Sequence, residues 1–488
     1  MIILINPAFN IAKSKYDTSL SVGLLSLASY LSQRGIDVLI IDCARQKDWQ
    51  EVLDKNLSRA MAVGLSVMTT QIPSAIELSK YIRDGQSNIK IIWGGVHSSF
   101  FPKQCIDLNI ADFAVIGEGE ETLYELLTNI QNGKKDFRDI KGIAFKNDNG
   151  DACLTEKRPL LSMQDIPLFD WNLMSKEVLD NLEIVPTHTS RGCPYRCSFC
   201  INAITQNRWR SHSADDVLKD LKIIKDKFFS GAKKMTLRFW DENFFVGIKR
   251  AKAVIDGILE RDLVIPWETT VRADYLGEGR IDDEFLEKLK QSGCYLLSFG
   301  AESGSPRILE KIKKGITPDQ VINSAKMCLK HSIIPQYSFM VGLPGEKKED
   351  MMMTVDLIDK LAKLSDKVQI LGPQAFRPYP GSPLYEECVA SGWQAPKSVG
   401  EWAELVDNQL NYLAVKNFPW VKEKDLVDSL EAYVRFGAHS FKSAMGSSIR
   451  APFVLKFGFV MLCKLRWIFK FFAWPVEFKL AKRFVTSL

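Results

Sequence analysis

Short apolar runs alternate with longer amphipathic stretches over the first 146 residues. The runs are rich in branched residues and bounded by turn residues, as strands are, and the stretches between them have the periodicity of helices. This alternation predicts an α/β domain over 1–146, Rossmann-like, with a doubly wound parallel sheet and a ligand at the carboxyl ends of its strands. We expect strands at Ile2–Ile5, Val38–Ile41, Met61–Val67, Ile89–Trp93 and Phe113–Ile116, and helices such as Leu24–Arg34, Ile72–Arg83 and Glu121–Asn132.

A second alternating region follows a less regular stretch. Residues 147–180 are expected to form a linker, which opens with the turn sequence Lys-Asn-Asp-Asn-Gly-Asp between short strands. Six further βα units then predict a partial (βα)6 TIM-like barrel over 181–400, with its active site at the carboxyl ends of the strands. Its expected strands are Ile184–Thr189, Met235–Phe239, Trp267–Val271, Tyr295–Phe299, Ile334–Met340 and Val368–Gln374, and its helices are 213–230, 247–260, 282–292, 317–331 and 347–364.

Composition narrows the class of protein. Hydrophobic residues make up 46% and charged residues 25% of the 488 positions, as in globular proteins, and this length calls for several cores. The first ten residues lack the basic and apolar stretches of a secretory signal, so a cytoplasmic location is expected. Seven of the ten cysteines are scattered singly and are expected to be packing thiols: Cys43, Cys105, Cys153, Cys294, Cys328, Cys388 and Cys463.

The positive charge is concentrated at the end of the chain. From Arg450 onwards there are eight basic residues and one acid, Glu477, so this tail carries +7 in a chain whose total is +5. The remaining −2 argues against a nucleic-acid partner.

Residues 401–488 are expected to form a helical cap with an amphipathic basic tail. Charges interrupt the apolar run 452–474 too often for a membrane-spanning helix, which needs about 20 apolar residues. On a helical wheel the charges fall on one side, so we expect 450–488 to touch the inner face of a membrane peripherally, against anionic lipid. Packing on the barrel or against a second copy is the alternative. The charged positions are Lys456, Lys464, Arg466, Lys470 and Glu477.

Three cysteines stand close together directly after the first expected barrel strand. Cys193, Cys197 and Cys200 have the spacing Cys-x3-Cys-x2-Cys, and no fourth cysteine lies near them. Three thiolates can hold a [4Fe-4S] cluster and leave one iron open for a cofactor or substrate. The alternative is a zinc site completed by His188 or His212, but zinc sites usually pair two knuckles across a longer loop.

This motif, with the aromatic Phe199 before its last cysteine, resembles the signature of the radical S-adenosylmethionine (SAM) superfamily. The resemblance implies that the open iron binds SAM and that an electron from the cluster cleaves SAM to a 5′-deoxyadenosyl radical. It also implies an electron donor such as flavodoxin or ferredoxin. By the same resemblance, residues at later strand ends would bind SAM together with Phe199: Asp241, Glu242, Arg272, Glu302 and Ser303.

Strings at the strand ends of the first domain resemble the cobalamin-binding domain found ahead of radical SAM barrels. The Asp-x-His-x-x-Gly string of many cobalamin proteins is absent, so the alternatives are a packing role for His97 and a domain that only shapes the substrate cavity. The candidate cobalamin-binding residues are Ser66, Thr69, Thr70, Gly94, Gly95, His97, Gly117, Glu118 and Gly119.

The resulting hypothesis is a cobalamin-dependent radical SAM enzyme that C-methylates a small-molecule, membrane-associated or lipid-like substrate. In the scheme that the resemblance implies, one SAM methylates cob(I)alamin and a second SAM yields the radical. Radical cyclisation or rearrangement without methyl transfer is the alternative within the class. A non-catalytic metal-binding scaffold is the alternative outside it, and a tRNA-modifying enzyme is disfavoured by the acidic body.

Overall fold

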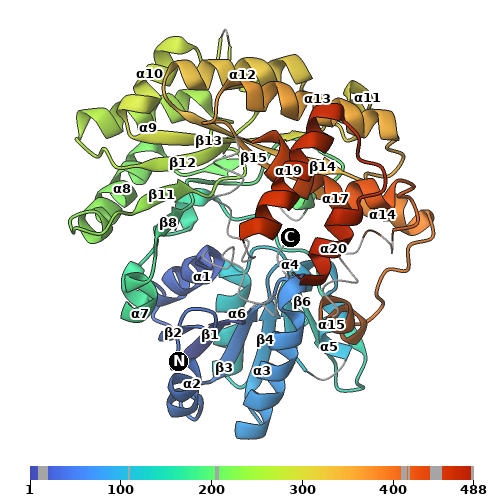
Figure 1. Cartoon of the computed structure of the whole chain (residues 1–488). Coiled ribbons are helices and arrows are strands. Elements are labelled where there is room, and N and C mark those ends of the chain that lie inside the picture. Colours follow the sequence, from blue (N-terminus) through green and yellow to red (C-terminus); the bar gives the residue numbers. More distant parts are fainter. Residues whose placement is uncertain are drawn as a thin grey trace. The chain divides into compact units, whose positions relative to one another are not determined.

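The computed structural model describes residues 1–8, 20–107, 110–203, 208–277, 279–407, 415, 418–439 and 453–484. The chain forms two compact units (Figure 1). The first holds Met1–Pro194, Asn202–Asp241 and Ala395–Tyr412, and the second holds Tyr195–Ile201, Glu242–Gln394 and Leu413–Leu488. Each unit is therefore assembled from segments that lie far apart in the sequence.

The first unit is built on a seven-stranded sheet. Its five parallel strands have the order β2-β1-β3-β4-β5, and an antiparallel hairpin of β6 and β7 extends the sheet beyond β5. The expected turn joins this hairpin, so the sheet runs to Leu154, past residue 146. The strands are β1 (Ile2–Asn6), β2 (Val38–Asp42), β3 (Ala62–Ser66), β4 (Lys90–Gly94), β5 (Phe113–Val115), β6 (Ile143–Lys146) and β7 (Ala152–Leu154).

Helices cover this sheet in two pairs. α1 (Val22–Ser32) packs against α6 (Glu120–Gln131), and α2 (Trp49–Leu57) packs against α3 (Ile72–Gly85) (Figure 1). The central strand β1 is buried along its whole length, as expected of a parallel strand covered on both faces. The prediction of a doubly wound α/β domain is thus confirmed. Two short helices follow β4, namely α4 (Val96–Phe100) and α5 (Pro102–Asp107).

The second sheet has six parallel strands in chain order, each followed by a helix, and it confirms the partial barrel. All six expected strands are present with ends shifted by a few residues, as are the five expected helices. The short helix α11 (Pro306–Lys311) was not predicted. The elements are β8 (Ile184–Thr187), α8 (Ala214–Phe228), β11 (Thr236–Phe239), α9 (Ile248–Glu260), β12 (Trp267–Val271), α10 (Asp283–Gln291), β13 (Cys294–Glu302), α12 (Pro318–Lys330), β14 (Ile334–Val341), α13 (Lys348–Leu364) and β15 (Gln369–Ala375).

Helices predominate after β15, as predicted. In the first unit α15 (Val399–Asp407) packs on α3, and in the second unit α17 (Lys424–Tyr433) runs into a π-helical turn, Val434–Ala438. α14 (Pro383–Ala390), α19 (Phe453–Phe469) and α20 (Val476–Phe484) complete the set. The parts of the expected cap and tail at 408–414, 416–417, 440–452 and 485–488 lie outside the described residues. Among the described helices, none combines the length and apolar character needed to cross a membrane.

Candidate active site

A buried carboxylate braces the residues that lead into the cysteine motif. Asp241, which follows β11, accepts hydrogen bonds from the Thr189 backbone N–H (2.7 Å), Thr189 Oγ1 (2.5 Å) and Ser190 Oγ (2.6 Å). Gly192 then adopts a φ of 80°, a left-handed conformation that favours glycine, directly before Cys193. Because Asp241 already serves these donors, its role as a SAM ligand stays a prediction.

Arginines on both sides of the motif pair with the segment that leads from β5 into α6. Arg191 Nη2 lies 2.7 Å from Glu120 Oε1, and Arg191 Nη1 lies 3.7 Å from Glu118 Oε1. Arg210 pairs with Glu118 through both carboxylate oxygens. Glu118, a predicted cobalamin residue, thus holds the start of the cysteine motif. Burial acts to raise the pKa of Glu120, but the Arg191 charge and hydrogen bond hold that pKa below its ordinary value.

The second half of the motif is anchored within the second unit by its central serine. The Ser198 N–H donates to the Ile312 carbonyl (3.0 Å), and the Ser198 carbonyl accepts from the Leu384 N–H (3.0 Å). The Cys200 N–H closes a turn on the Cys197 carbonyl at 3.1 Å. The ends of α11 and α14 therefore fix the backbone between these two half-buried cysteines.

Arg272, at the end of β12, lies against the cysteine loop as predicted, but it is already well bonded. Its guanidinium carbon sits 3.8 Å from the centroid of the Tyr195 ring, inside the motif. Its Nε donates to Asp274 Oδ1 (2.9 Å), and its Nη2 donates to the Lys314 carbonyl (2.7 Å). Tyr195 in turn hydrogen-bonds Tyr275 at 2.8 Å between the hydroxyl oxygens. Arg272 thus joins the loop at 314–315 to the motif, and its pairing with the SAM carboxylate stays a prediction.

Glu302 and Phe199, both predicted for SAM, are brought together by a lysine that the sequence did not single out. Lys314 Nζ lies 2.8 Å from Glu302 Oε1 and 5.6 Å from the centroid of the Phe199 ring. Glu302 has a φ of 64°, strained for a residue with a side chain, beside a register shift in β13. Strain and bulges of this kind concentrate at functional sites.

The two remaining SAM candidates differ in their surroundings. Ser303 is fully buried, and its Oγ lies 3.2 Å from Thr354 Oγ1, which also accepts from the Gly304 N–H. This bonding indicates a structural task for Ser303 at the end of β13. Glu242 is exposed directly after β11. Whether either residue binds SAM stays a prediction.

The predicted cobalamin residues converge at the carboxyl ends of three adjacent strands, β3, β4 and β5. The His97 N–H donates to the Val67 carbonyl, and the Gly117 N–H donates to Ser99 Oγ of α4 (2.9 Å). A Cβ on Gly95 would lie 3.0 Å from the Val67 nitrogen, whereas a Cβ on Gly117 would meet no atom within 4 Å. Thr69 and Thr70 are half-buried beside them.

His97 is buried among aromatic rings instead of being held open. Its ring centroid lies 5.3 Å from Phe101 and 5.7 Å from Trp402 of α15, and Thr69 Oγ1 is 3.3 Å from its Nδ1. Burial lowers the pKa of His97 to about 4, so the ring is neutral at pH 7. Within the described residues its Nε2 has no hydrogen-bond partner. His97 therefore packs at the edge of the strand-end cluster, and one of its ring nitrogens has no hydrogen-bond partner among the described residues.

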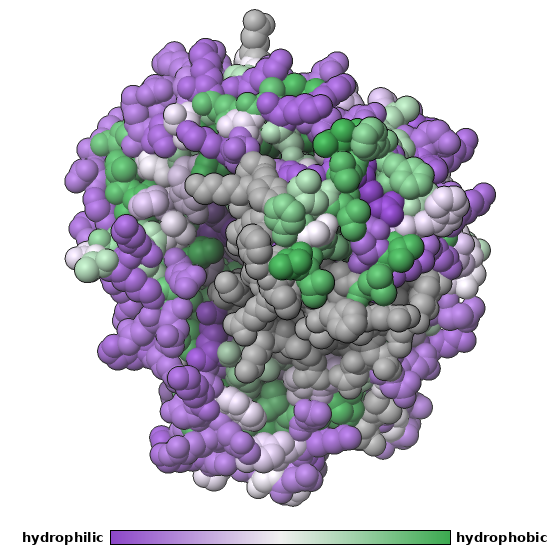
Figure 2. Space-filling view, viewed as in Figure 1, coloured by the Kyte–Doolittle hydropathy of each residue, from purple (hydrophilic) through white to green (hydrophobic). Residues whose placement is uncertain are grey.

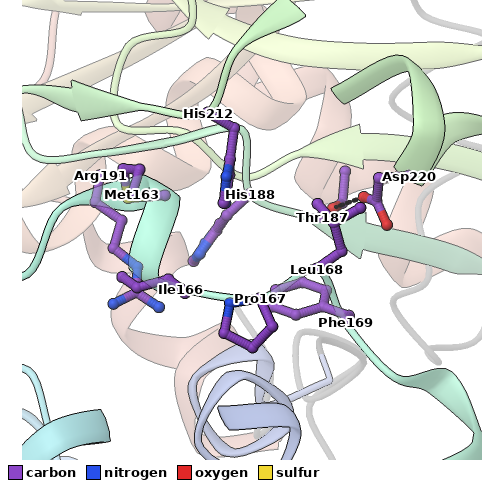
Figure 3. Close-up of a pocket in the computed structure, with 10 residues that line it drawn as sticks. All are labelled: Met163, Ile166, Pro167, Leu168, Phe169, Thr187, His188, Arg191, His212 and Asp220. Carbon is purple, nitrogen blue, oxygen red and sulfur yellow. Dashed lines mark hydrogen bonds between the residues drawn. The ribbon is translucent and has the colours of Figure 1, made fainter. Parts of the chain in front are cut away.

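A small pocket, partly open to solvent, lies beside β8 in the first unit (Figure 3). His188, His212 and Arg191 point into it, with Phe169 and Pro167 of the preceding segment on its other side. Asp220 of α8 accepts from Thr187 Oγ1 at 2.8 Å, and burial raises its pKa to about 6. Burial likewise lowers the pKa of His188 to about 3. The pocket thus places a neutral His188 beside the charged Arg191, directly behind the start of the cysteine motif.

These residues fit the implied cofactors in donor chemistry. All ten cysteines lie in the described ranges and none forms a disulfide. The three motif residues are therefore thiols, the usual ligands of an iron–sulfur cluster. The described residues contain no preassembled group of three His, Cys, Asp or Glu side chains around one point, and the motif passes from one unit to the other after Pro194. The glycine-lined ends of β4 and β5, with the unused His97 nitrogen, suit a large planar ligand.

Sequence reasoning missed several of the positioning residues. Lys314, Arg210 and Trp402 lie in segments without a local motif, and only the fold brings them to the predicted residues. Tyr195 and Arg191 could have been found, because both lie inside or next to the cysteine motif.

Two family models match the chain. Residues 187–358 match the radical SAM superfamily, and residues 8–127 match the B12 binding domain. The chain is 32% identical over 377 residues to the uncharacterized methyltransferase PH0819 of Pyrococcus horikoshii, covering 76% of this chain and 78% of that protein. It is 23% identical to the cytidylyl-2-hydroxyethylphosphonate methyltransferase of Streptomyces wedmorensis, with 81% and 83% covered.

Solved structures share the fold. The methyltransferase TsrM from Kitasatospora setae superposes with a TM-score of 0.66 at 20% identity, over 81% of this chain and 77% of that one. The cobalamin-dependent radical enzyme OxsB also gives 0.66 at 20% identity over 84% of this chain, which spans only 56% of OxsB. The chain therefore carries the domains for a [4Fe-4S] cluster, SAM and cobalamin, and it belongs to the family of radical SAM enzymes with a B12-binding domain, among relatives that are methyltransferases.

Proposed function

We propose that this protein is a cobalamin-dependent radical SAM C-methyltransferase. The observation that carries the proposal is the pairing of a Cys-x3-Cys-x2-Cys loop after the first barrel strand with a B12-binding domain in one chain. The bound cluster would supply the electron that cleaves SAM, and cobalamin would supply the methyl group.

The chain's own residues would hold and orient these groups. Cys193, Cys197 and Cys200 would ligate three irons, and Asp241 and Ser198 fix the backbone on either side. Phe199, Glu302 and Lys314 form the adjoining wall in the second unit, beside Arg272, where SAM would bind. The loops after β3, β4 and β5 would cradle the corrin, as glycine-rich strand ends can.

The substrate that we propose is an apolar, membrane-associated small molecule. A broad apolar surface on α19 and α20 supports this choice. A flavodoxin or ferredoxin would serve as the electron donor, and the protein would work at the inner face of the membrane.

Anaerobic turnover tests the cluster. Protein reconstituted with iron, sulfide and cobalamin, reduced with titanium(III) citrate in the presence of SAM, should release 5′-deoxyadenosine. Cys197→Ala should lose iron and 5′-deoxyadenosine while retaining cobalamin, because the B12-binding domain does not contain this residue. Cys153→Ser, a cysteine on β7 outside the motif, is the matched control and should behave as the wild type. Retained activity in Cys197→Ala would exclude this chemistry.

A label tests the methyl transfer. With SAM carrying a deuterated methyl group and a lipid extract of the native host, the label should appear on carbon in a lipid product. Radical cleavage with an altered lipid that carries no deuterium would reject methyl transfer in favour of cyclisation or rearrangement.

A further inference from the structure

The polar side of α19 is turned toward the protein. Lys464 Nζ donates to the carbonyls of Gly437 (3.3 Å) and His439 (2.6 Å), and Arg466 pairs with Glu477 of α20. Lys470 lies 3.5 Å from Asp359 of α13, which also accepts from Trp467 Nε1 at 2.8 Å. Burial lowers the pKa of both Lys464 and Lys470. The basic stripe that the sequence led us to place against lipid thus holds the helix to its own unit.

Close backbone packing fixes this orientation. A Cβ on Gly437, in the π-helical turn, would lie 2.7 Å from Trp467 Cβ and 2.8 Å from the Cys463 carbonyl oxygen. Val460, Cys463 and Trp467 are accordingly buried on this side. The opposite side of α19 must therefore face outward.

That outward side is entirely apolar. Every described exposed residue of α19 is apolar or glycine, along a helix about 25 Å long. Figure 2 shows hydrophobic side chains gathered over α19 and α20. Twelve of the 22 exposed large hydrophobic residues in the described part of the chain lie here, which makes it the main apolar surface: Val454, Leu455, Phe457, Met461, Leu462, Leu465, Ile468, Phe469, Phe471, Trp474, Val476 and Leu480.

The chemistry of this face favours lipid over a second copy. A protein interface of useful size carries polar groups that form about one hydrogen bond per 100–200 Å², and the outward side of α19 offers none from its side chains. Arg466, Lys470 and Lys479 pair with acids of their own unit, but the sequence from Arg450 onwards still has a basic excess, which would make two facing copies repel each other and which an anionic bilayer complements. Trp474, 77% exposed in the connection between α19 and α20, is the residue type enriched at bilayer interfaces.

We propose that α19 and α20 dock this protein on an anionic lipid bilayer. The apolar face would enter the interfacial region, and the excess basic charge of the tail would attract the anionic headgroups. The docking goes beyond the proposed reaction and does not depend on it. It would place the catalytic chain where an apolar substrate is concentrated.

Vesicle sedimentation tests the docking with the full-length holoprotein. Wild type should sediment with vesicles of phosphatidylglycerol and phosphatidylcholine, and Leu465→Glu/Ile468→Glu should bind at least tenfold more weakly. Leu154→Glu/Ile223→Glu is the matched control, because it changes the same net charge at two exposed apolar positions of the first unit. The control should bind as the wild type does, and all three proteins should release 5′-deoxyadenosine equally.

Two further measurements distinguish a lipid bilayer from a second copy of the chain as the partner of the apolar face. Lipids brominated on their acyl chains should quench tryptophan fluorescence in the wild type more than in Trp474→Phe. Equal vesicle binding by Leu465→Glu/Ile468→Glu and wild type would overturn the proposal. So would a wild-type dimer by light scattering that the same variant converts to monomer while neither protein binds vesicles.

Discussion

Gly300 leaves room for the buried pair beside Phe199. A Cβ at this position would clash with Glu302 Oε1 and lie 2.7 Å from Lys314 Nζ, so the ends of both side chains would have to shift. We expect Gly300→Ala to weaken SAM binding roughly tenfold, a cost of about 1.4 kcal/mol, while the iron content is unchanged. Equilibrium dialysis of SAM against the reconstituted protein measures this. Gly231→Ala is the control, because a Cβ there meets no atom within 4 Å. An equal affinity for SAM in the wild type and both variants would show that the Glu302–Lys314 pair does not contribute to SAM binding.

His97 gives the apoprotein a specific sensitivity to acid. Its folded-state pKa of about 4 lies below the ordinary 6.5, so the unfolded chain takes up the proton first and stability falls as the pH drops from 6.5 to 4. At pH 5 the loss amounts to about 2 kcal/mol. We expect His97→Phe, which keeps an aromatic ring beside Phe101 and Trp402, to flatten the fall in melting temperature between pH 7.5 and pH 5. Parallel curves for the two apoproteins would assign the acid sensitivity to other groups.

The ion pairs between the β5–α6 loop and the cysteine motif couple two elements that are distant in sequence. Glu120 is buried and Arg191 is half-buried, so removing Arg191 leaves a buried carboxylate unpaired, and loss of one partner of a buried pair typically costs 3–5 kcal/mol. We expect Glu120→Gln and Arg191→Met each to lower the melting temperature by several degrees, and the double variant to lose much less than both effects combined. A double-mutant cycle by calorimetry gives the coupling. Additive losses would mean that the pair contributes no joint stabilisation.

The elements themselves were largely predictable because strand and helix periodicities agree with the fold throughout both sheets. The buried, branched strand β1 and the amphipathic helix α3 show this agreement in particular. The cysteine motif was readable because its spacing is local. Lys314 and Trp402 could not be read, because only long-range folding brings them to Glu302 and His97.

The sequence also could not predict which face of α19 packs against the protein. A helical wheel separates charged from apolar sides but does not say which side meets the protein, and Asp359, Glu477 and the carbonyl of His439 decide that. The expected stripe is present and its side chains bond within the unit, while contact of the tail with a membrane stays a prediction.

On the scale of the whole molecule, the two compact units do not correspond to consecutive segments of the chain. The chain leaves the first unit after Pro194 and returns to it at Asn202–Asp241 and again at Ala395–Tyr412, so the domain bounds 1–146, 181–400 and 401–488 inferred from the sequence remain a prediction about chain segments. Trp402 anchors the segment Ala395–Tyr412 in the first unit, because its side chain is fully buried against Phe101 and His97.

We therefore expect Trp402→Ala to loosen the first unit selectively. Truncating a buried tryptophan costs about 3–5 kcal/mol, and hydrogen exchange should accelerate in β3, β4 and α3 while β13 and β14 stay protected. Trp467→Ala, which removes the ring packed against Gly437, is the matched variant and should accelerate exchange around the π-helical turn and α19 instead. Because each ring is packed within its own unit, the two exchange maps should not overlap. A Trp402→Ala map that spread equally through the β13–β14 region would show that the two units unfold as one, and that the returning segment has no separate role in holding the B12-binding domain together.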